Sequence, residues 1–227
     1  DEISFGGVPT YNSHAAAWGD FDSDGRDDLL IAGPAGGTYL LRNLGDLGFL
    51  DATPAILQSA GAVISPVWAD HDGDGLPDLL VTCWNDPSLL LRNAGGGAFA
   101  DVTPSELSWP AADTSADWAD YDRDGDLDLF VGRGAKQGDL LLRNDGAAGF
   151  TDASGSIGLD PGDTRGCAWG DLDGDGDPDL VLARAGKACL LRNDGGVLVD
   201  ASASLNARPA NYISVAAGDH DNDGDFD

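Results

Sequence analysis

Short apolar runs of Leu, Val and Ile recur about every 50 residues along the chain, and each is bounded by Gly or Pro. Runs of this length and composition are typical of strands that are buried on both faces. No helical period of apolar residues is sustained anywhere in the sequence. The pattern predicts one such strand in each repeat, over residues 28–32, 78–82, 128–132 and 179–183.

Three further strands are expected in each repeat. The first ends in Trp two residues before an acidic loop and covers residues 14–18 in the first copy. The third ends in the sequence Leu-Leu-Arg-Asn, after which a Gly-containing turn returns the chain into the fourth strand. The fourth strands begin near Phe49, Phe99, Phe150 and Leu198. Four strands in a repeat of about 50 residues describe one blade of a β-propeller.

These repeats divide the chain without any linker between them. We expect a single repeat domain over residues 1–227, with repeats at 14–63, 64–113, 114–164 and 165–212 and a partial repeat at 213–227. Residues 1–13 are expected to form the trailing strand of a preceding or closing blade. The segments that follow the fourth strands cross to the next blade and vary most in sequence.

The stretch between the first and second strand of each repeat is acidic. Its first copy, Asp20-Phe-Asp-Ser-Asp-Gly-Arg-Asp-Asp28, carries carboxylates at positions 1, 3, 5 and 9 and glycine at position 6. Calcium is bound by about six to eight oxygens, and alternate residues of a tightly curled loop can bring several carboxylates to one ion. Glycine at position 6 can adopt a positive φ, which directs the backbone carbonyl of position 7 inward. The stretch therefore predicts a calcium loop.

The same loop occurs five times, so we expect about one Ca²⁺ for each repeat and up to five in all. An EF-hand would need Glu at position 12, where this sequence has the following apolar run. The predicted carboxylate ligands are Asp20, Asp22, Asp24 and Asp28; Asp70, Asp72, Asp74 and Asp78; Asp120, Asp122, Asp124 and Asp128; Asp171, Asp173, Asp175 and Asp179; and Asp219, Asp221, Asp223 and Asp227. The predicted carbonyl ligands at position 7 are Arg26, Leu76, Asp126, Asp177 and Asp225.

A second signature accompanies the loops. It reads Leu-Leu-Arg-Asn-x-Gly over residues 40–45, leads to Phe-x-Asp-x-Thr over residues 49–53, and returns at residues 90–103, 141–154 and 190–202. With both signatures the chain resembles the FG-GAP/VCBS repeat family of calcium-loop β-propellers. This family includes the heads of integrin α-subunits, cartilage acidic protein and many bacterial secreted proteins. The resemblance implies an all-β propeller, or an open segment of one, with a calcium loop between strands 1 and 2 of each blade.

Composition excludes several classes of partner. The chain has 40 Asp and Glu against 12 Lys and Arg, a formal net charge of −28. Five bound Ca²⁺ ions would bring this charge to −18, which still repels nucleic acid and anionic membrane surfaces. No apolar run approaches the roughly 18 residues of a membrane span. The odd number of cysteines in mostly apolar positions predicts buried free thiols at Cys83, Cys167 and Cys189.

Other recurring residues have structural interpretations. We expect the Trp of each first strand, namely Trp18, Trp68, Trp118 and Trp169, to lie in the core. The signature also places an Arg in each repeat, at Arg42, Arg92, Arg143 and Arg192. We expect each to pair with a nearby carboxylate or carbonyl, and the alternative is a ring of Arg side chains that reads a ligand. The Asp-x-Thr/Ser sequences predict turns capped by side chains. Outside the repeat pattern stand Trp84, Trp109 and Tyr212, which are either core fillers, the favoured interpretation, or contacts for a ligand.

The predicted function is that of an extracellular, non-catalytic interaction or adhesion module for protein or glycan partners, stabilised by calcium. No nucleophile elbow, zinc spacing or phosphate loop is present, so no catalytic residue is predicted. One alternative is a structural subunit of a self-assembling extracellular fibre or surface layer. Another is a propeller-based enzyme that acts on glycans.

The last calcium loop ends at Asp227, where a second strand should begin. We therefore expect either that further repeats follow or that a neighbouring molecule completes this blade. An open blade edge exposes unpaired N–H and C=O groups, so self-association in calcium is the expected consequence.

Overall fold

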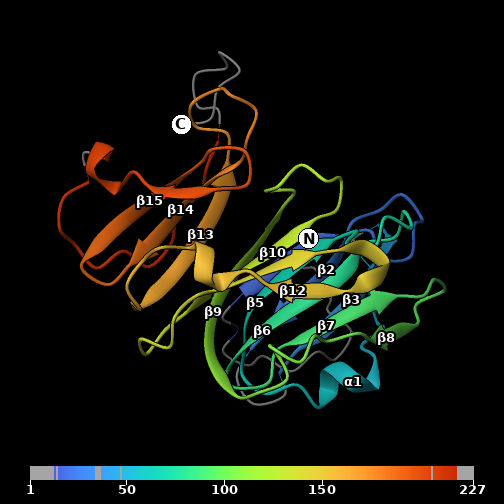
Figure 1. Ribbon diagram of the computed structural model, residues 1–227. Coiled ribbons are helices and arrows are strands. Elements are labelled where there is room, and N and C mark those ends of the chain that lie inside the picture. Colours follow the sequence, from blue (N-terminus) through green and yellow to red (C-terminus); the bar gives the residue numbers. More distant parts are fainter. Residues whose placement is uncertain (1–12, 14, 34–36, 47, 206, 219–227) are drawn as a thin grey trace. The chain divides into compact units, whose positions relative to one another are not determined.

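A computed structural model describes residues 13, 15–33, 37–46, 48–205 and 207–218 (Figure 1). The chain divides into two compact units, Asp1–Ala111 and Ala112–Asp227, and each contains two repeats. The partial fifth repeat reaches its calcium loop only at residues 219–227, so the predicted fifth site lies outside the described residues. So does the strand expected near the start of the chain.

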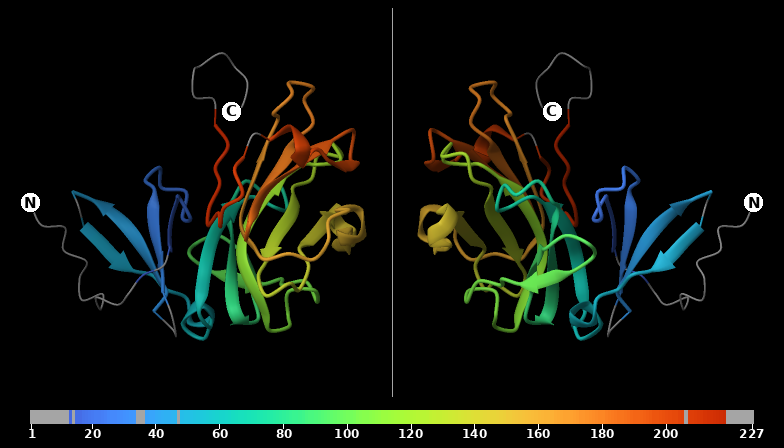
Figure 2. Two further views of the ribbon diagram at one scale, coloured as in Figure 1. Left: turned by 90° about the vertical axis from the view of Figure 1, so that its left-hand side faces the viewer. Right: turned by 90° about the vertical axis from the view of Figure 1, so that its right-hand side faces the viewer.

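Every complete repeat forms four antiparallel strands that pair in sequence order, and Figure 2 shows β1 to β4 side by side in blue. The strands of the first unit are β1 (Ala15–Gly19), β2 (Asp28–Ala32), β3 (Tyr39–Gly45), β4 (Gly48–Asp51), β5 (Val63–Ala69), β6 (Asp78–Asp86), β7 (Leu89–Asn93) and β8 (Phe99–Asp101). Those of the second are β9 (Ala111–Ala119), β10 (Asp128–Arg133), β11 (Leu140–Asn144), β12 (Phe150–Asp152), β13 (Thr164–Gly170), β14 (Asp179–Arg184), β15 (Lys187–Asn193) and β16 (Leu198–Asp200). This all-β arrangement of four-stranded blades is the predicted propeller-type fold.

The second strands confirm the sequence pattern most closely. β2, β6, β10 and β14 begin at the predicted Asp, and their first three residues are buried in every case except Val181 of β14. Helical structure among the described residues is confined to short connections: α1 (Ala55–Gln58), η1 (Gly146–Ala148), η2 (Ser154–Ser156) and η3 (Ser202–Ser204). Because β6 continues to Asp86, four residues beyond the predicted end, Trp84 lies within a strand.

Each unit has its own apolar core between its two blades. In the first unit, Leu30 and Leu40 of the first blade pack with Leu79 and Leu91 of the second, and Leu57 of α1 joins them. The core of the second unit contains Phe130 and Leu141 with Leu180, Leu182 and Leu191. A single blade would leave one apolar face in water, so pairs of blades bury what neither could bury alone.

The Trp column shows how successive blades meet within a unit. A Cβ atom added at Gly19 of the first blade would lie 2.9 Å from the indole of Trp68 in the second blade. In the second unit the ring of Trp169 stacks on Tyr121 of the preceding repeat, with ring centroids 6.3 Å apart, and meets Phe130 edge-on at 6.4 Å. Each of these Trp rings is therefore covered by the repeat before it.

The prediction that the Trp column lies in the core is wrong at Trp18, which is 59% exposed. Its indole contacts Phe49 of its own blade, with centroids 6.5 Å apart. The described residues include no earlier repeat that could cover the other face of this ring. The favoured core-filler interpretation is also wrong for Trp109, which is 73% exposed, and for Trp84, which is 40% exposed.

All three cysteines are free, as predicted. Cys83 and Cys189 are also buried, as predicted, whereas Cys167 is only partly buried. Desolvation raises the pKa of the Cys167 thiol to about 12. Because the thiolate is the reactive form, this shift disfavours reaction of Cys167 near neutral pH.

The close contact between Gly19 and Trp68 gives a test of blade packing. Gly19→Ala should destabilise the protein by about 1–3 kcal/mol, because the added methyl group overpacks a site where both the backbone and the indole are fixed. The matched control is Gly155→Ala, where nothing lies within 4 Å of the added Cβ. Denaturant unfolding measures both, and equal midpoints for the two variants would contradict this account of blade packing.

Candidate metal centres

The four described acidic loops share one backbone conformation. Position 6 has the positive φ that the sequence predicts, with values of 86°, 87°, 99° and 88° at Gly25, Gly75, Gly125 and Gly176. The loops connect the first and second strand of each repeat, as expected. A side chain at this position would be strained, because L-residues rarely adopt such angles.

The carboxylate at position 1 closes the curl of the loop. In the first repeat, Oδ1 of Asp20 accepts the N–H of Asp24 at 3.0 Å, and Oδ2 accepts the N–H of Gly25 at 2.9 Å. The second and third loops repeat both bonds, and the fourth keeps the bond to the glycine. These hydrogen bonds fix both the orientation of the position 1 carboxylate and the curled conformation of the loop backbone.

The carboxylate at position 9 is the most deeply buried group of the loop. Oδ2 of Asp128 accepts the N–H of Tyr121 at 3.0 Å, and Oδ1 accepts the N–H of Asn144 in β11 at 2.7 Å. The other repeats make the same two bonds. One side chain thus ties the start of the loop, the second strand and the third strand together.

Burial makes these carboxylates unfavourable as isolated anions. Desolvation raises the pKa of Asp128 to about 7 and also raises the pKa values of Asp28 and Asp179. The N–H donors act in the opposite direction but do not compensate for the burial. A bound cation would supply the missing charge compensation.

Carboxylate oxygens of positions 1, 3 and 9 converge in each described loop and lie within 4.8 Å of one another. At position 3, one oxygen of Asp22 and one of Asp122 are buried without a hydrogen-bond partner. Oxygen-only sets with acceptors that have no donor suit a hard cation, so these residues fit calcium. The converging groups are Asp20, Asp22 and Asp28; Asp70, Asp72 and Asp78; Asp120, Asp122 and Asp128; and Asp171, Asp173 and Asp179.

The remaining predicted ligands are placed differently. The carboxylate at position 5 is not part of the converging group; instead it accepts the N–H of position 7, as Asp74 does from Leu76 at 2.9 Å. The loop 4 counterpart is the 2.8 Å bond from Asp177 to Asp175. Metal binding stays a prediction for every loop position, including the converging positions 1, 3 and 9, and for the fifth loop. In loop 2 the buried His71 adds a contact, with Nδ1 2.5 Å from Oδ2 of Asp78.

The signature Asn has a role that the sequence did not reveal. Nδ2 of Asn93 donates to the carbonyl of Phe21, in the calcium loop of the preceding repeat, at 2.7 Å and to the carbonyl of Pro77 in its own loop at 3.1 Å. Asn193 makes the equivalent bonds to Tyr121 and Pro178. The recurrence of Asn at one position of every repeat could have indicated a structural role. It does not identify the hydrogen-bond partner, which lies 72 residues away in the sequence.

The other two recurring motifs behave as predicted. Each Arg of the signature lies within ion-pair distance of a carboxylate, for example Arg192 to Asp194 at 2.7 Å. The Asp-x-Thr/Ser turns are capped as expected: Oδ1 of Asp51 accepts the N–H of Thr53 at 2.9 Å, and the Thr53 hydroxyl accepts the N–H of Leu40 at 2.9 Å.

A buried ionic network occupies the opposite end of the second strands in the second unit. Arg184, at the end of β14, lies 3.8 Å from Asp139 and donates to the carbonyl of Asp160 at 2.9 Å. Asp139 also accepts the backbone N–H of Arg133 and the Thr164 hydroxyl, both at 2.9 Å. Every charge here has a partner within the network, which gives it a structural role.

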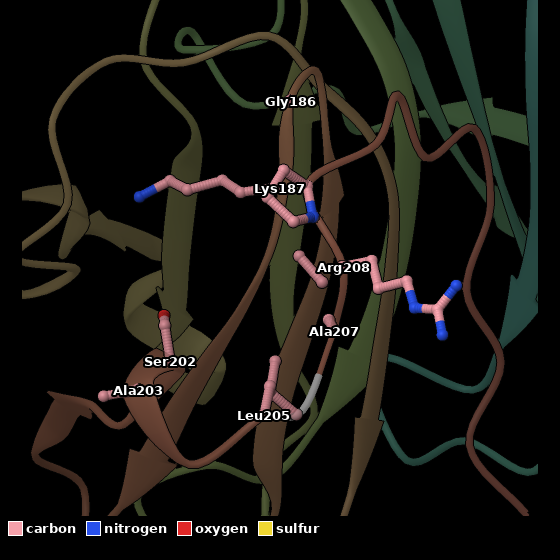
Figure 3. Close-up of a pocket in the computed structure, with 9 residues that line it drawn as sticks. Gly186, Lys187, Ser202, Ala203, Leu205, Ala207 and Arg208 are labelled. Carbon is pink, nitrogen blue, oxygen red and sulfur yellow. The ribbon is translucent and has the colours of Figure 1, made fainter.

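Two cavities lie at the surface of the described residues. One, of about 480 Å³, is next to the first calcium loop and is lined by Phe21, Asp22, Arg42, Leu50, Ala52, Gly96 and Gly97. The other, of about 260 Å³, lies beside β15 and η3. Figure 3 shows that Lys187 and Arg208 of this second cavity point away from each other, so they do not converge on one ligand.

Comparison with known proteins agrees with the repeat structure. The sequence model of the FG-GAP-like repeat family matches residues 20–81, 72–131, 128–182 and 171–227. No curated protein sequence matches the chain. No helix among the described residues is long and apolar enough to cross a membrane.

Two solved structures share the fold. One is an Agrocybe aegerita lectin described as recognising non-reducing terminal N-acetylglucosamine; it has 23% identity and a TM-score of 0.54 over 82% of this chain and 51% of the lectin. The other is BBS1N in complex with ARL6DN, with 19% identity and a TM-score of 0.55 over 87% of this chain and 59% of that one. The chain thus spans about half to three fifths of the length of these structures.

The Asn93 amide joins two loops, so its removal should lower the stability of the fold. Asn93→Ala leaves the carbonyl of Phe21 without its donor in a buried setting, which we expect to destabilise the protein by about 1–3 kcal/mol. The control is Asn43→Ala, because among the described residues the Asn43 amide donates within its own repeat, in an exposed bond to Asp27. Urea denaturation compares the two, and an equal loss for both variants would refute the role of the bond between loops.

Proposed function

Because the chain belongs to the FG-GAP-like repeat family, whose model matches it from residue 20 to residue 227, we propose that it is a calcium-stabilised, non-catalytic interaction module that acts outside the cell. The observation that carries this proposal is the set of three converging carboxylates in each described loop, with the buried, unpaired oxygens of Asp22 and Asp122. Extracellular modules bind calcium at about 10⁻⁴–10⁻³ M, which suits exposed loops of this kind.

Calcium acts here as a folding ligand rather than as a reagent. Each loop brings several carboxylates together, and their mutual repulsion opposes folding until a cation compensates for it. The position 9 carboxylates also hold the second and third strands of each blade, so charge compensation at the loop stabilises the blade itself.

The described acidic residues support a non-catalytic role. The pKa of Asp117 is raised by burial, but both of its oxygens accept backbone N–H bonds, from Trp118 at 2.9 Å and from Trp169 at 3.0 Å. Asp139 is likewise used within the buried ionic network. The position 9 carboxylates accept the same two backbone N–H bonds in each of the four described loops, which supports a structural role for them.

Partner binding is assigned to exposed aromatic residues outside the repeat pattern. Trp109 and Trp84 are exposed although the blade geometry does not require either side chain. An exposed indole offers a large apolar face for stacking on a sugar ring or a peptide. The similar lectin and the BBS1N complex are described as binding a glycan and a protein, respectively, which supports both classes of partner for this fold.

A second candidate function is self-assembly into an extracellular fibre or surface layer. The exposed ring of Trp18 favours it, because an exposed indole offers an apolar face on which a neighbouring molecule can pack.

Calcium removal tests the main proposal. A site occupied at about 100 times its dissociation constant stabilises the folded state by about 2.7 kcal/mol, so several sites together rival the whole stability of a typical domain. Excess EDTA should therefore lower the melting temperature strongly, and calcium, but not magnesium at the same concentration, should restore it. Thermal unfolding followed by circular dichroism measures this, and an unchanged melting temperature in EDTA would disprove calcium as a folding ligand.

Partner binding is tested at the exposed indoles. We expect Trp109→Ala or Trp84→Ala to weaken binding to a glycan or protein ligand about fivefold or more while changing the unfolding free energy by less than about 0.5 kcal/mol. A glycan array that includes terminal N-acetylglucosamine identifies the probe, and calorimetry then compares the variants. Val102→Ala, another exposed apolar side chain, is the control. Wild-type affinity in both Trp variants would place the ligand elsewhere.

A further inference from the structure

The four signature arginines differ in the carboxylates with which they pair. In the third and fourth repeats the second residue after Arg is Asp, and the guanidinium pairs with it. Arg143 Nε lies 2.8 Å from Asp145, and Arg192 donates to both oxygens of Asp194 at 2.9 and 2.7 Å. Arg143 also forms a longer ion pair with Asp122 of loop 3, at 3.9 Å, so Asp122 shares this guanidinium with the much closer Asp145. Among the described residues, no ion pair joins Arg192 to a carboxylate of loop 4.

The first repeat has no such aspartate. Leu44 stands at the equivalent position, and the guanidinium of Arg42 lies on the calcium loop instead. Its Nε is 2.5 Å from Oδ2 of Asp22, and its Nη2 is 3.3 Å from Oδ2 of Asp24. Both carboxylates are predicted ligands of the first calcium ion. The second repeat, with Ala94, is intermediate, since Arg92 lies 3.7 Å from Asp72.

A second cation joins the first loop alone. Position 7 is Arg26 there, and its guanidinium contacts Asp24 while Nε donates to the carbonyl of Asn43 at 3.0 Å. The other described loops have Leu76, Asp126 and Asp177 at this position. Loop 4 also receives a cation, Arg123, but it pairs at 2.7 Å with the side chain of Asp177, which is not a predicted carboxylate ligand.

We propose that Arg42 and Arg26 compete with calcium for the carboxylates of loop 1, so that this loop fills at a higher calcium concentration than loops 3 and 4. The proposal rests on the calcium binding proposed above. Each guanidinium occupies oxygens that the ion would need, and a positive charge held beside the site repels the ion. The residue two places after the signature Arg decides which carboxylate that Arg pairs with.

The structure also provides room for the exchange. Arg42 lines the cavity of about 480 Å³ beside loop 1, together with Leu50 and Ala52. A guanidinium displaced by calcium can move into this space without disturbing the core. The chain would then respond to calcium in stages, with loops 3 and 4 of the second unit loaded before loop 1 of the first.

A reciprocal exchange of residues tests the proposal. Leu44→Asp offers Arg42 the partner that Arg192 has, and Asp194→Leu removes that partner from Arg192. Leu44 is 52% exposed and the Asp194 side chain 46% exposed, so both variants should fold. Arg42→Gln removes the competing charge directly and checks the first variant independently, and Leu44→Asn is the uncharged control.

The readout is one amide for each loop in ¹H–¹⁵N correlation spectra of the whole chain during calcium titration. Gly25, Gly125 and Gly176 serve well, because their N–H groups bond to the position 1 carboxylates. In the wild type the Gly25 signal should move at a calcium concentration higher than the other two. Leu44→Asp and Arg42→Gln should lower its midpoint on the order of tenfold, and Asp194→Leu should raise the Gly176 midpoint.

The outcomes separate this inference from the calcium proposal itself. Equal midpoints for Gly25 and Gly176 in the wild type, or a Gly25 midpoint that neither Leu44→Asp nor Arg42→Gln lowers, would overturn the competition while leaving calcium binding intact. A shift of the same size in Leu44→Asn would also overturn it. If none of the glycine signals responds to calcium, both proposals are wrong.

Discussion

The buried carboxylate at loop position 9 is the group on which each blade depends. In the third repeat, Asp128 accepts one N–H from the start of its loop and another from β11, and it is itself the first residue of β10. Burying an anion is unfavourable unless hydrogen bonds and opposite charge compensate for it. The backbone supplies the hydrogen bonds, and a cation held by positions 1, 3 and 9 would supply the charge. Binding of such a cation would thus be coupled to folding of the blade through a single side chain.

Successive blades are joined by two further recurring residues. The amide of Asn93 bonds to the loop of the preceding repeat, and the indole of Trp68 packs on Gly19 of that repeat. The bonds from Asn193 and the stacking of Trp169 reproduce this pattern in the second unit. Because these contacts involve the calcium loop or the strand beside it, the loops contribute to packing between blades as well as within them. Repeat proteins derive their stability from such nearest-neighbour terms.

The net charge of −28 does not describe how individual charged side chains are paired in the structure. Most described arginines are paired with aspartates, and which aspartate a given Arg meets depends on residues next to it in the sequence. Arg192 meets Asp194, whereas Arg42 has Leu44 two positions later and lies on its calcium loop. Loops with the same consensus can therefore differ in how much negative charge they offer to an ion. Calcium affinity depends on ligand charge, so under the proposed calcium binding these pairings would give the loops different affinities.

The sequence by itself determined the repeat length, the strand order within each blade, the loop conformation and the all-β propeller class, because all of these follow from local rules. Alternating carboxylates, glycine at a positive φ and apolar runs act over a few residues and recur in register. The start of every second strand at Asp and the capping of the Asp51 turn were predictable for the same reason. Tertiary structure alone decided which carboxylates converge, the bond from Asn93 to Phe21, the exposure of Trp18 and the partner of each Arg. These features depend on contacts between atoms of different strands and repeats. Copies of a repeat share a consensus sequence, but the residues that surround each copy in the folded protein differ.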